Sequence, residues 1–288
     1  STTDLVFAGD NMIAENGTIL ARSKRFNNEC VYTELDLERL VGERKKSNTY
    51  NIVGSEKYVS VKLDMNIGDT KITRYVDKQP FVPSDDKKRE KRSEEILSIQ
   101  SLGLKKRLDH THAKTAVVGV SGGLDSTLAL LVTVRAFDSL NLDRKNIIAV
   151  TMPCFGTTDR TYNNAVNFAN SLGVTLKEVN IKAAVNQHFA DIEHDPNLYD
   201  VTYENSQARE RTQILMDVAN KSGGLVIGTG DMSELALGWA TYNGDHMSMY
   251  GVNAGVPKTL IRYLVDYEAK RTNNDILKKT LQDILDTP

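Results

Sequence analysis

From residue 114 onward, short apolar runs alternate with longer segments in which apolar residues recur at helical spacing. The runs are rich in Val, Ile and Leu, as expected for strands that are buried on both faces. The predicted strands lie at 115–120, 146–153, 175–181 and 224–228. The predicted helices lie at 126–137, 161–173, 182–192 and 202–223. Strands that alternate with helices form a parallel sheet covered on both faces, so the fold class is a doubly wound α/β domain.

The region before this domain has a different pattern. Alternating apolar and polar residues flank Asn16 and Gly17, a dipeptide typical of a tight β-hairpin turn. A second alternating stretch, 58–76, predicts further short strands. Two prolines and a dense run of charges follow, and because acids and bases alternate we interpret the run as a solvated linker into a helix at 94–108. The predicted divisions are a β-rich region 1–76, a linker 77–92 and the α/β domain 93–288.

Composition narrows the classes of function. The 288 residues carry a net charge of −2, with an isoelectric point near 6.2, so no overall positive field favours nucleic acid or an anionic membrane. No apolar run reaches the roughly 18 residues needed to span a bilayer, and we expect a cytoplasmic protein. Cys30 and Cys154 do not cluster with histidines or form C-x-x-C, so we expect two thiols rather than a metal site. Cys154 follows a predicted strand and is a candidate to line a pocket.

The segment S-G-G-L-D-S, residues 121–126, lies between the first predicted strand and helix. In such sheets ligands bind beyond the carboxyl ends of the strands. Gly122 and Gly123 allow backbone N–H groups to turn toward an anion, and the following helix N-terminus adds a partial positive charge. Ser121 and Ser126 offer hydroxyl donors, and Ser126 is also a candidate N-cap. The loop therefore predicts a pyrophosphate site.

Asp125 decides what kind of phosphate chemistry this loop supports. The chain contains neither G-x-x-x-x-G-K-[ST] nor G-x-G-x-x-G, the loops of kinase-type and dinucleotide-binding sites. A carboxylate beside phosphates repels them unless Mg²⁺ lies between, so Asp125 predicts a metal that holds a leaving pyrophosphate while a substrate oxygen attacks the α-phosphorus to form an adenylate. The alternative is that Asp125 only caps the helix.

The loop resembles the signature of the PP-loop ATP-pyrophosphatases, which activate a carboxylate or carbonyl as its adenylate. The stretches 204–216 and 228–264 resemble the NAD synthetase family almost throughout. That resemblance covers residues 81 to about 285, and residues 1–7 with 13–26 are similar to the end of the glutaminase domain in the glutamine-dependent branch. It implies an adenine nucleotide alpha hydrolase-like fold preceded by the C-terminal part of a nitrilase-like domain.

The resemblance implies a reaction and a set of residues. The reaction is amidation of deamido-NAD to NAD by ammonia, with Mg²⁺, while ATP is split to AMP and pyrophosphate. Asp125 and Lys258 would be catalytic, and Asp125 and Glu234 would bind the metal. The implied ATP-binding residues are Ser121, Gly122, Gly123, Asp125, Ser126, Thr229 and Lys258. The implied deamido-NAD-binding residues are Asn205, Arg209, Glu234, Trp239, Ala240, Thr241, Tyr242 and Asp245.

Several of these residues have a simpler interpretation. Arg209 and Arg211 lie two apart on a helix and cannot share one face, so we favour Arg209 for the dinucleotide and leave Arg211 open as an ion-pair partner. Trp239 would stack on a pyridine or adenine ring, or pack in the core. Glu234 lies on an apolar helix, where a buried carboxylate needs a partner such as a metal; the alternative is a surface glutamate. Lys258 would contact pyrophosphate or be solvated.

The sequence also bears on the nitrogen donor, the assembly and the alternative functions. In the resembling proteins the glutaminase Glu, Lys and Cys lie upstream of where this chain begins, so Cys30 is not expected to be a nucleophile and ammonia is expected to replace glutamine. The family chain also continues past residue 288 with a segment that helps to cover the substrate, so turnover is expected to be weak. We expect a homodimer across the parallel-sheet domain. The alternatives are another PP-loop amidating ligase, of the GMP or asparagine synthetase type, and a catalytically silent nucleotide-binding module.

Overall fold

The computed structural model describes residues 6–49, 59–62, 64, 68, 70–156 and 158–287. The chain divides into two compact units, 1–78 and 79–288, each with its own internal packing. Within the described residues, no helix has the length and apolar content needed to cross a membrane.

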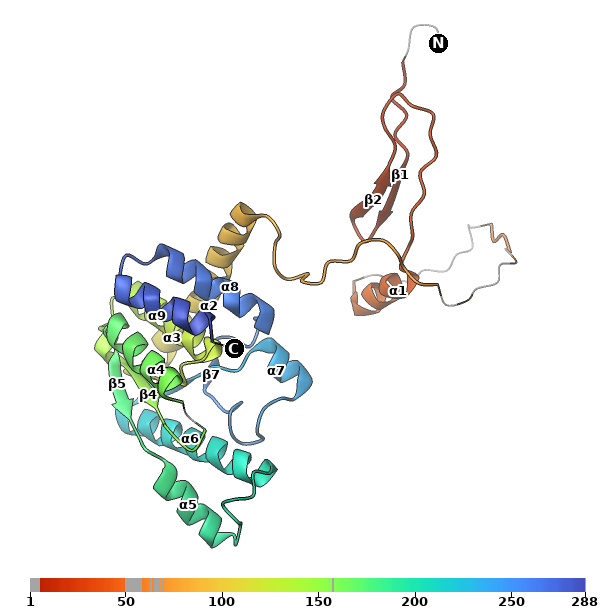
Figure 1. Cartoon of the computed structure of the whole chain (residues 1–288). Coiled ribbons are helices and arrows are strands. Elements are labelled where there is room, and N and C mark those ends of the chain that lie inside the picture. The colour runs from red at the N-terminus through yellow and green to blue at the C-terminus, as the bar shows by residue number, and fades with distance from the viewer. Residues whose placement is uncertain are drawn as a thin grey trace. The chain divides into compact units, whose positions relative to one another are not determined.

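The larger unit is built on a five-stranded parallel sheet (Figure 1). Its strands are β3 (Thr115–Gly119), β4 (Ile147–Thr151), β5 (Thr175–Glu178), β6 (Gly224–Gly228) and β7 (Tyr250–Gly251). The order is β5-β4-β3-β6-β7, and every neighbouring pair is parallel. The chain builds outward from β3 to β5 and then returns to the other side of β3, so the strand order reverses between β3 and β6. The carboxyl ends of these two strands are where a ligand crevice is expected.

Helices cover both faces of the sheet (Figure 1). One face is covered by α2 (Asp86–Thr111), α3 (Leu124–Ser139), α4 (Asp159–Leu172), α8 (Lys258–Arg271) and α9 (Asp275–Leu285). The other face carries α5 (Lys182–Asp191) and α6 (Val201–Ser222). Alternate strand residues serve the two layers: Ala116 and Val118 pack with the first group, whereas Val117 packs with the second. The predicted doubly wound α/β fold is confirmed.

The four helices predicted between the strands are found with their ends shifted by at most two residues, whereas the helix predicted at 94–108 is longer at both ends. Two short elements complete this unit, the 3-10 helix η1 (Arg144–Asn146) and α7 (Met232–Leu237). Helix α7 ends before Gly238, which adopts a left-handed φ of 70° and forms the C-cap. Glycine takes that conformation at little cost, so the helix stops before Trp239.

The predicted linker 77–92 was too long, because α2 already begins at Asp86. Asp85 caps the helix by accepting a hydrogen bond from the Lys88 amide. The alternating charges then pair along the helix surface, Arg89 with Asp86 and Lys91 with Glu95. Such spacings stabilise exposed helices, so a charge run that we interpreted as a solvated linker is a solvated first half of a helix.

The smaller unit contains an antiparallel hairpin of β1 (Met12–Glu15) and β2 (Thr18–Arg22), followed by α1 (Leu37–Lys46). Asn16 and Gly17 both have positive φ, 46° and 79°, as a tight hairpin turn requires, so the predicted turn is confirmed. The further strands predicted at 58–76 fall partly outside the described residues. The residues of this stretch that the structure describes belong to no strand.

Candidate functional site

The S-G-G-L-D-S loop follows the central strand β3 and leads into α3. Gly122 has a φ of 85°, and a Cβ there would lie 2.2 Å from the carbonyl oxygen of Thr161, so only glycine fits. The loop is held by its own hydroxyls: the Gly123 amide donates to Ser121 Oγ at 3.2 Å, and Ser126 Oγ donates to the Gly123 carbonyl at 3.1 Å. The N-cap of α3 is Gly123, without a side-chain cap. The proposed cap roles of Ser126 and Asp125 are therefore wrong.

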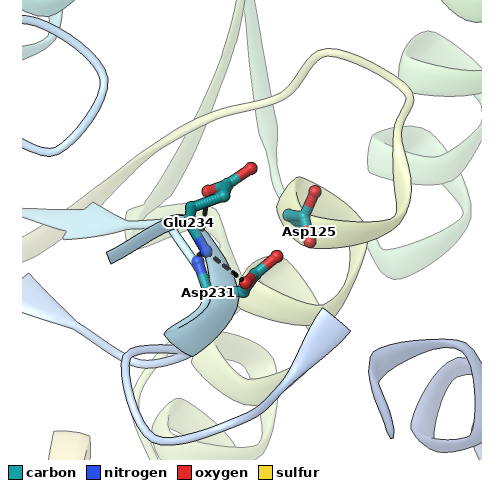
Figure 2. A group of neighbouring side chains, drawn as sticks. All are labelled: Asp125, Asp231 and Glu234. Carbon is teal, nitrogen blue, oxygen red and sulfur yellow. Dashed lines mark hydrogen bonds between the residues drawn. The ribbon is translucent and has the colours of Figure 1, made fainter. Parts of the chain in front are cut away.

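Three carboxylates from two elements converge beside this loop (Figure 2). Asp125 comes from the first turn of α3, whereas Asp231 and Glu234 come from the start of α7. One oxygen of each lies within 4.8 Å of the others. Carboxylate oxygens at this spacing form the donor set that Mg²⁺ prefers.

Asp231 and Glu234 are fixed by a capping box. Asp231 Oδ1 accepts from the amides of Ser233 and Glu234, at 2.6 and 3.0 Å, and Glu234 Oε2 accepts from the Asp231 amide at 3.2 Å. Asp231 is 0% exposed. Its Oδ2 and Asp125 Oδ1 are buried without a hydrogen-bond partner among the described residues. Buried carboxylate oxygens need compensation, so this donor set fits a divalent cation.

Lys258, the first residue of α8, supplies the positive charge beside this cluster. Its Nζ bonds to Asp125 Oδ2 and lies 3.4 Å from Asp231 Oδ2 and 3.6 Å from Glu234 Oε1. Burial raises the pKa of the Asp125 and Glu234 carboxyls. Burial alone would lower the pKa of Lys258, but the hydrogen bond to Asp125 and the charges of the three carboxylates together raise it. Three carboxylates facing one ammonium have a formal excess of negative charge, which a divalent cation would balance.

The cluster opens into a cavity of about 1200 Å³ between the ends of β3, β4 and β6 and helix α6. Seven of the residues predicted for the site line it: Ser121, Asp125, Ser126, Thr229, Glu234, Trp239 and Asp245. Lys258, Gly122 and Gly123 lie next to lining residues rather than on the cavity wall.

Of the remaining predicted residues, Asn205, Arg209, Thr241 and Tyr242 take part in hydrogen bonds between α6 and the 239–245 segment, which also contains Ala240. Thr241 Oγ1 donates to Asn205 Oδ1 at 2.8 Å, and Arg209 Nε donates to the Tyr242 carbonyl at 3.2 Å. The Thr241 amide donates to Asp245 at 3.2 Å. The structure thus brings residues predicted for one substrate together from segments more than 30 positions apart.

Residues 96–280 match the model of the NAD synthase family. The chain belongs to this family. Glutamine-dependent NAD(+) synthetases from Mycobacterium leprae and Aquifex aeolicus are 41% and 30% identical, over 100% and 92% of this chain and 45% of each of those proteins. The chain therefore spans about half the length of the curated relatives that it matches.

Solved structures of related proteins share the fold of this NAD synthase family member. The glutamine-dependent NAD+ synthetase from Acinetobacter baumannii, in complex with ADP, matches with a TM-score of 0.60 at 24% identity, over 96% of this chain and 45% of that one. NMN synthetase from Francisella tularensis matches with a TM-score of 0.58 at 22% identity, over 68% and 74%.

Two sequence interpretations change once the cavity is known. Trp239 is 74% exposed, so its alternative as a core residue is wrong. Arg211, which the sequence left open as an ion-pair partner, lines the cavity, whereas Arg209 is bound to the Tyr242 carbonyl. Arg211 is therefore, like Arg209, a candidate ligand-binding residue.

Other residues of the cavity in this NAD synthase family member were missed. An aromatic group lines one end: Tyr199 and Tyr203 meet edge to face at 4.8 Å between ring centroids, and Phe155 lies 5.9 Å from Tyr203. Cys154, next to Phe155, is buried and is not among the lining residues, so its prediction as a pocket residue is not supported. Asp231 was also missed, although D-x-x-E before an apolar run is the signal of a capping box.

Proposed function

We propose that this chain is a carbon–nitrogen ligase that amidates deamido-NAD to NAD through an adenylate, while ATP is converted to AMP and pyrophosphate. The observation that carries the proposal is the group of Asp125, Asp231, Glu234 and Lys258 at the S-G-G-L-D-S loop, in a chain of the NAD synthase family.

The phosphate end of the reaction is assigned to the loop and the cluster. The loop amides, the hydroxyls of Ser121 and Ser126, and the N-terminus of α3 would hold the β- and γ-phosphates of ATP. Asp125 and Glu234 would bind Mg²⁺, with Asp231 beside them, and the bound metal would neutralise phosphate charge. Lys258 would stabilise the charge that develops on the departing pyrophosphate.

The other substrate is assigned to the rest of the cavity. Trp239 and Asp245 on the cavity wall, together with Asn205, Arg209 and residues 240–242, would position deamido-NAD so that its nicotinate carboxylate attacks the α-phosphorus of ATP in line. Ammonia would then displace AMP from the acyl adenylate. Both steps rely on orientation, which in favourable intramolecular cases lowers the barrier by about 7 to 11 kcal/mol.

The nitrogen donor and the assembly are part of the proposal. Ammonia is the donor for this chain, and Cys30, an exposed thiol, takes no part. A homodimer across the parallel-sheet domain is also part of the proposal, and membership of the NAD synthase family supports it.

The experiment is a substrate panel with MgATP and ammonium. Deamido-NAD should give product, while nicotinate mononucleotide, xanthosine monophosphate and aspartate should not. Product from one of these three instead would show another amidating ligase, and ATP binding without turnover of any would show a silent nucleotide-binding module. Glutamine should give no NAD when free ammonia is scavenged, and Cys30→Ala should leave the ammonium-dependent rate unchanged.

A further inference from the structure

Asn253 is fully buried between β7 and α8, in the segment that leads to Lys258. Its Nδ2 donates two hydrogen bonds, to the carbonyl oxygen of Asp125 at 2.9 Å and to that of Thr229 at 3.0 Å. Its Oδ1 accepts from Gln100 Nε2 at 3.1 Å, and the same Gln100 nitrogen donates to the Val252 carbonyl at 2.8 Å. All polar atoms of the Asn253 side chain are thus engaged.

These bonds join the segments that carry the charged cluster. The Asp125 carbonyl belongs to the first turn of α3, and the Thr229 carbonyl belongs to the loop that reaches Asp231 two residues later. Asn253 itself lies five residues before Lys258. The Asn253 side chain therefore links the two segments that carry Asp125 and the Asp231–Glu234 pair to the segment that carries Lys258.

Other bonds hold only part of this arrangement. The Met232 amide donates to the Val256 carbonyl at 3.0 Å, and the Lys258 amide donates to Ser233 Oγ at 3.1 Å. The first bond joins α7 to the segment before α8, the second joins α7 to the start of α8, and neither reaches α3. Asn253 also connects α3, because it donates to the backbone carbonyl of Asp125. This contact does not depend on the direction of the Asp125 carboxylate.

We propose that Asn253 is a positioning residue that sets the distance between Asp125 and the Asp231–Glu234 pair, and thereby the geometry for the metal and the pyrophosphate; this rests on the proposed function. A carboxamide suits the role because its nitrogen carries two hydrogens that reach two acceptors at once. An aspartate at this position offers none, and a serine offers one.

The test is Asn253→Asp, which keeps the shape and the acceptor for Gln100 but removes both donated hydrogens. The carbonyls of Asp125 and Thr229, both partly buried, then lose a partner and face a carboxylate. The Kd for MgATP, measured by calorimetry, should rise by about tenfold or more. The KM for ATP should rise and kcat should fall, while the KM for deamido-NAD stays within about twofold of the parent, because its predicted contacts lie elsewhere.

A matched control separates positioning from simple loss of stability. Asn164, in α4, is also buried, and its Nδ2 donates to Asp283 Oδ2 at 2.7 Å. Asn164→Asp also replaces a buried asparagine by aspartate, but Asn164 is not among the residues that line the cavity. This variant should therefore lower Tm and leave the Kd for MgATP unchanged. Gln100→Glu, which removes the donor to Asn253, should raise that Kd in the same direction by a smaller factor.

The outcomes distinguish the two proposals. If folded Asn253→Asp binds MgATP as tightly as the parent, or if Asn164→Asp weakens binding equally, the positioning role is wrong while the proposed function stands. Should Asn253→Asp fail to fold, Gln100→Glu decides, and an unchanged Kd contradicts the role. If the parent chain itself does not bind MgATP, the proposed function fails and the role of Asn253 fails with it.

Discussion

Two parts of the site are built in opposite ways: the charged cluster of Asp125, Asp231, Glu234 and Lys258, which we call the carboxylate end, and the segment 239–245 beside α6, which we call the dinucleotide end after its proposed substrate. At the carboxylate end, Asp231 and Asn253 are 0% exposed, and each is held by hydrogen bonds to or from backbone groups. At the dinucleotide end, Trp239 is 74% exposed and Tyr242 is 82% exposed. The first end is fixed by the fold, whereas the second presents side chains that a substrate or another chain would cover.

This difference matches what each end has to do in the proposed reaction. Stabilising a leaving pyrophosphate requires charges that are placed before the reaction begins, since groups that reorganise during the reaction contribute less. Holding a large dinucleotide requires contact area, which exposed aromatic rings provide at low entropic cost. Substitutions at the carboxylate end should therefore affect catalysis and the binding of MgATP, whereas those at the dinucleotide end should affect the KM for deamido-NAD.

The largest effect is expected for Asp125→Asn. The substitution keeps the size of the side chain but removes the charge that faces Lys258 and the proposed metal, so the rate of NAD formation should fall by about two to three orders of magnitude. Steady-state rates with MgATP, deamido-NAD and ammonium provide the measurement. Asp143→Asn is the matched control, because Asp143 only caps η1 by accepting from the Lys145 amide. Near-parental activity of Asp125→Asn would refute its role as a metal ligand.

Asp231→Asn tests whether the buried third carboxylate does more than cap α7. Asparagine retains an oxygen for the Ser233 and Glu234 amides, so Tm should change little, but loss of the charge should raise the Kd for Mn²⁺ in the presence of ATP by about tenfold. Asp231→Ala also removes the cap, which typically costs about 0.5 to 2 kcal/mol, and should lower Tm. Parental Mn²⁺ affinity in Asp231→Asn would mean that Asp231 is only a cap.

Trp239→Ala examines the exposed end. Loss of a stacking surface should raise the KM for deamido-NAD by roughly three- to tenfold, and the KM for ATP should stay constant. Because the side chain is exposed, Tm should not fall. Leu237→Ala is the control, since Leu237 is 59% exposed and is not among the cavity-lining residues. A clear fall in Tm for Trp239→Ala alone would contradict the description of this end.

The smallest effect concerns Glu94, away from the cavity wall, where the hydrogen bond from Arg135 lowers the pKa of the carboxyl. A carboxyl with a lowered folded-state pKa stabilises the fold above its unfolded pKa and loses that contribution as the pH falls through its folded value. Glu94→Gln should therefore reduce stability near neutral pH and flatten the acid side of a Tm-against-pH profile. A profile parallel to that of the parent would contradict this.

The sequence predicts the strands and helices of residues 115–228 because their signals are local. Gly173 and Gly223 end two of the helices, and apolar residues repeat with the period of each element. Helix α8 carries a similar local signal in Leu260, Ile261, Leu264 and Val265, all of which are buried. Strand β7 has two residues and exists only because Tyr250 pairs with Ile227; a strand that short has no periodicity to detect.

Only some residues of the site can be predicted from the sequence. Asp125 stands out locally because an acid in a phosphate loop demands a metal, and the capping box of Asp231 can also be found from its spacing. Asn253 has no such signal. Its partners are 128, 24 and 153 positions away, so only the folded arrangement shows what it joins.

The central claim is that the carboxylate end serves adenylate formation, and phosphorus NMR of the reaction products tests it most directly. With MgATP, deamido-NAD and ammonium, AMP and pyrophosphate should form in equal amounts together with NAD, and neither should form when deamido-NAD or Mg²⁺ is left out. Formation of ADP and inorganic phosphate instead would contradict the account.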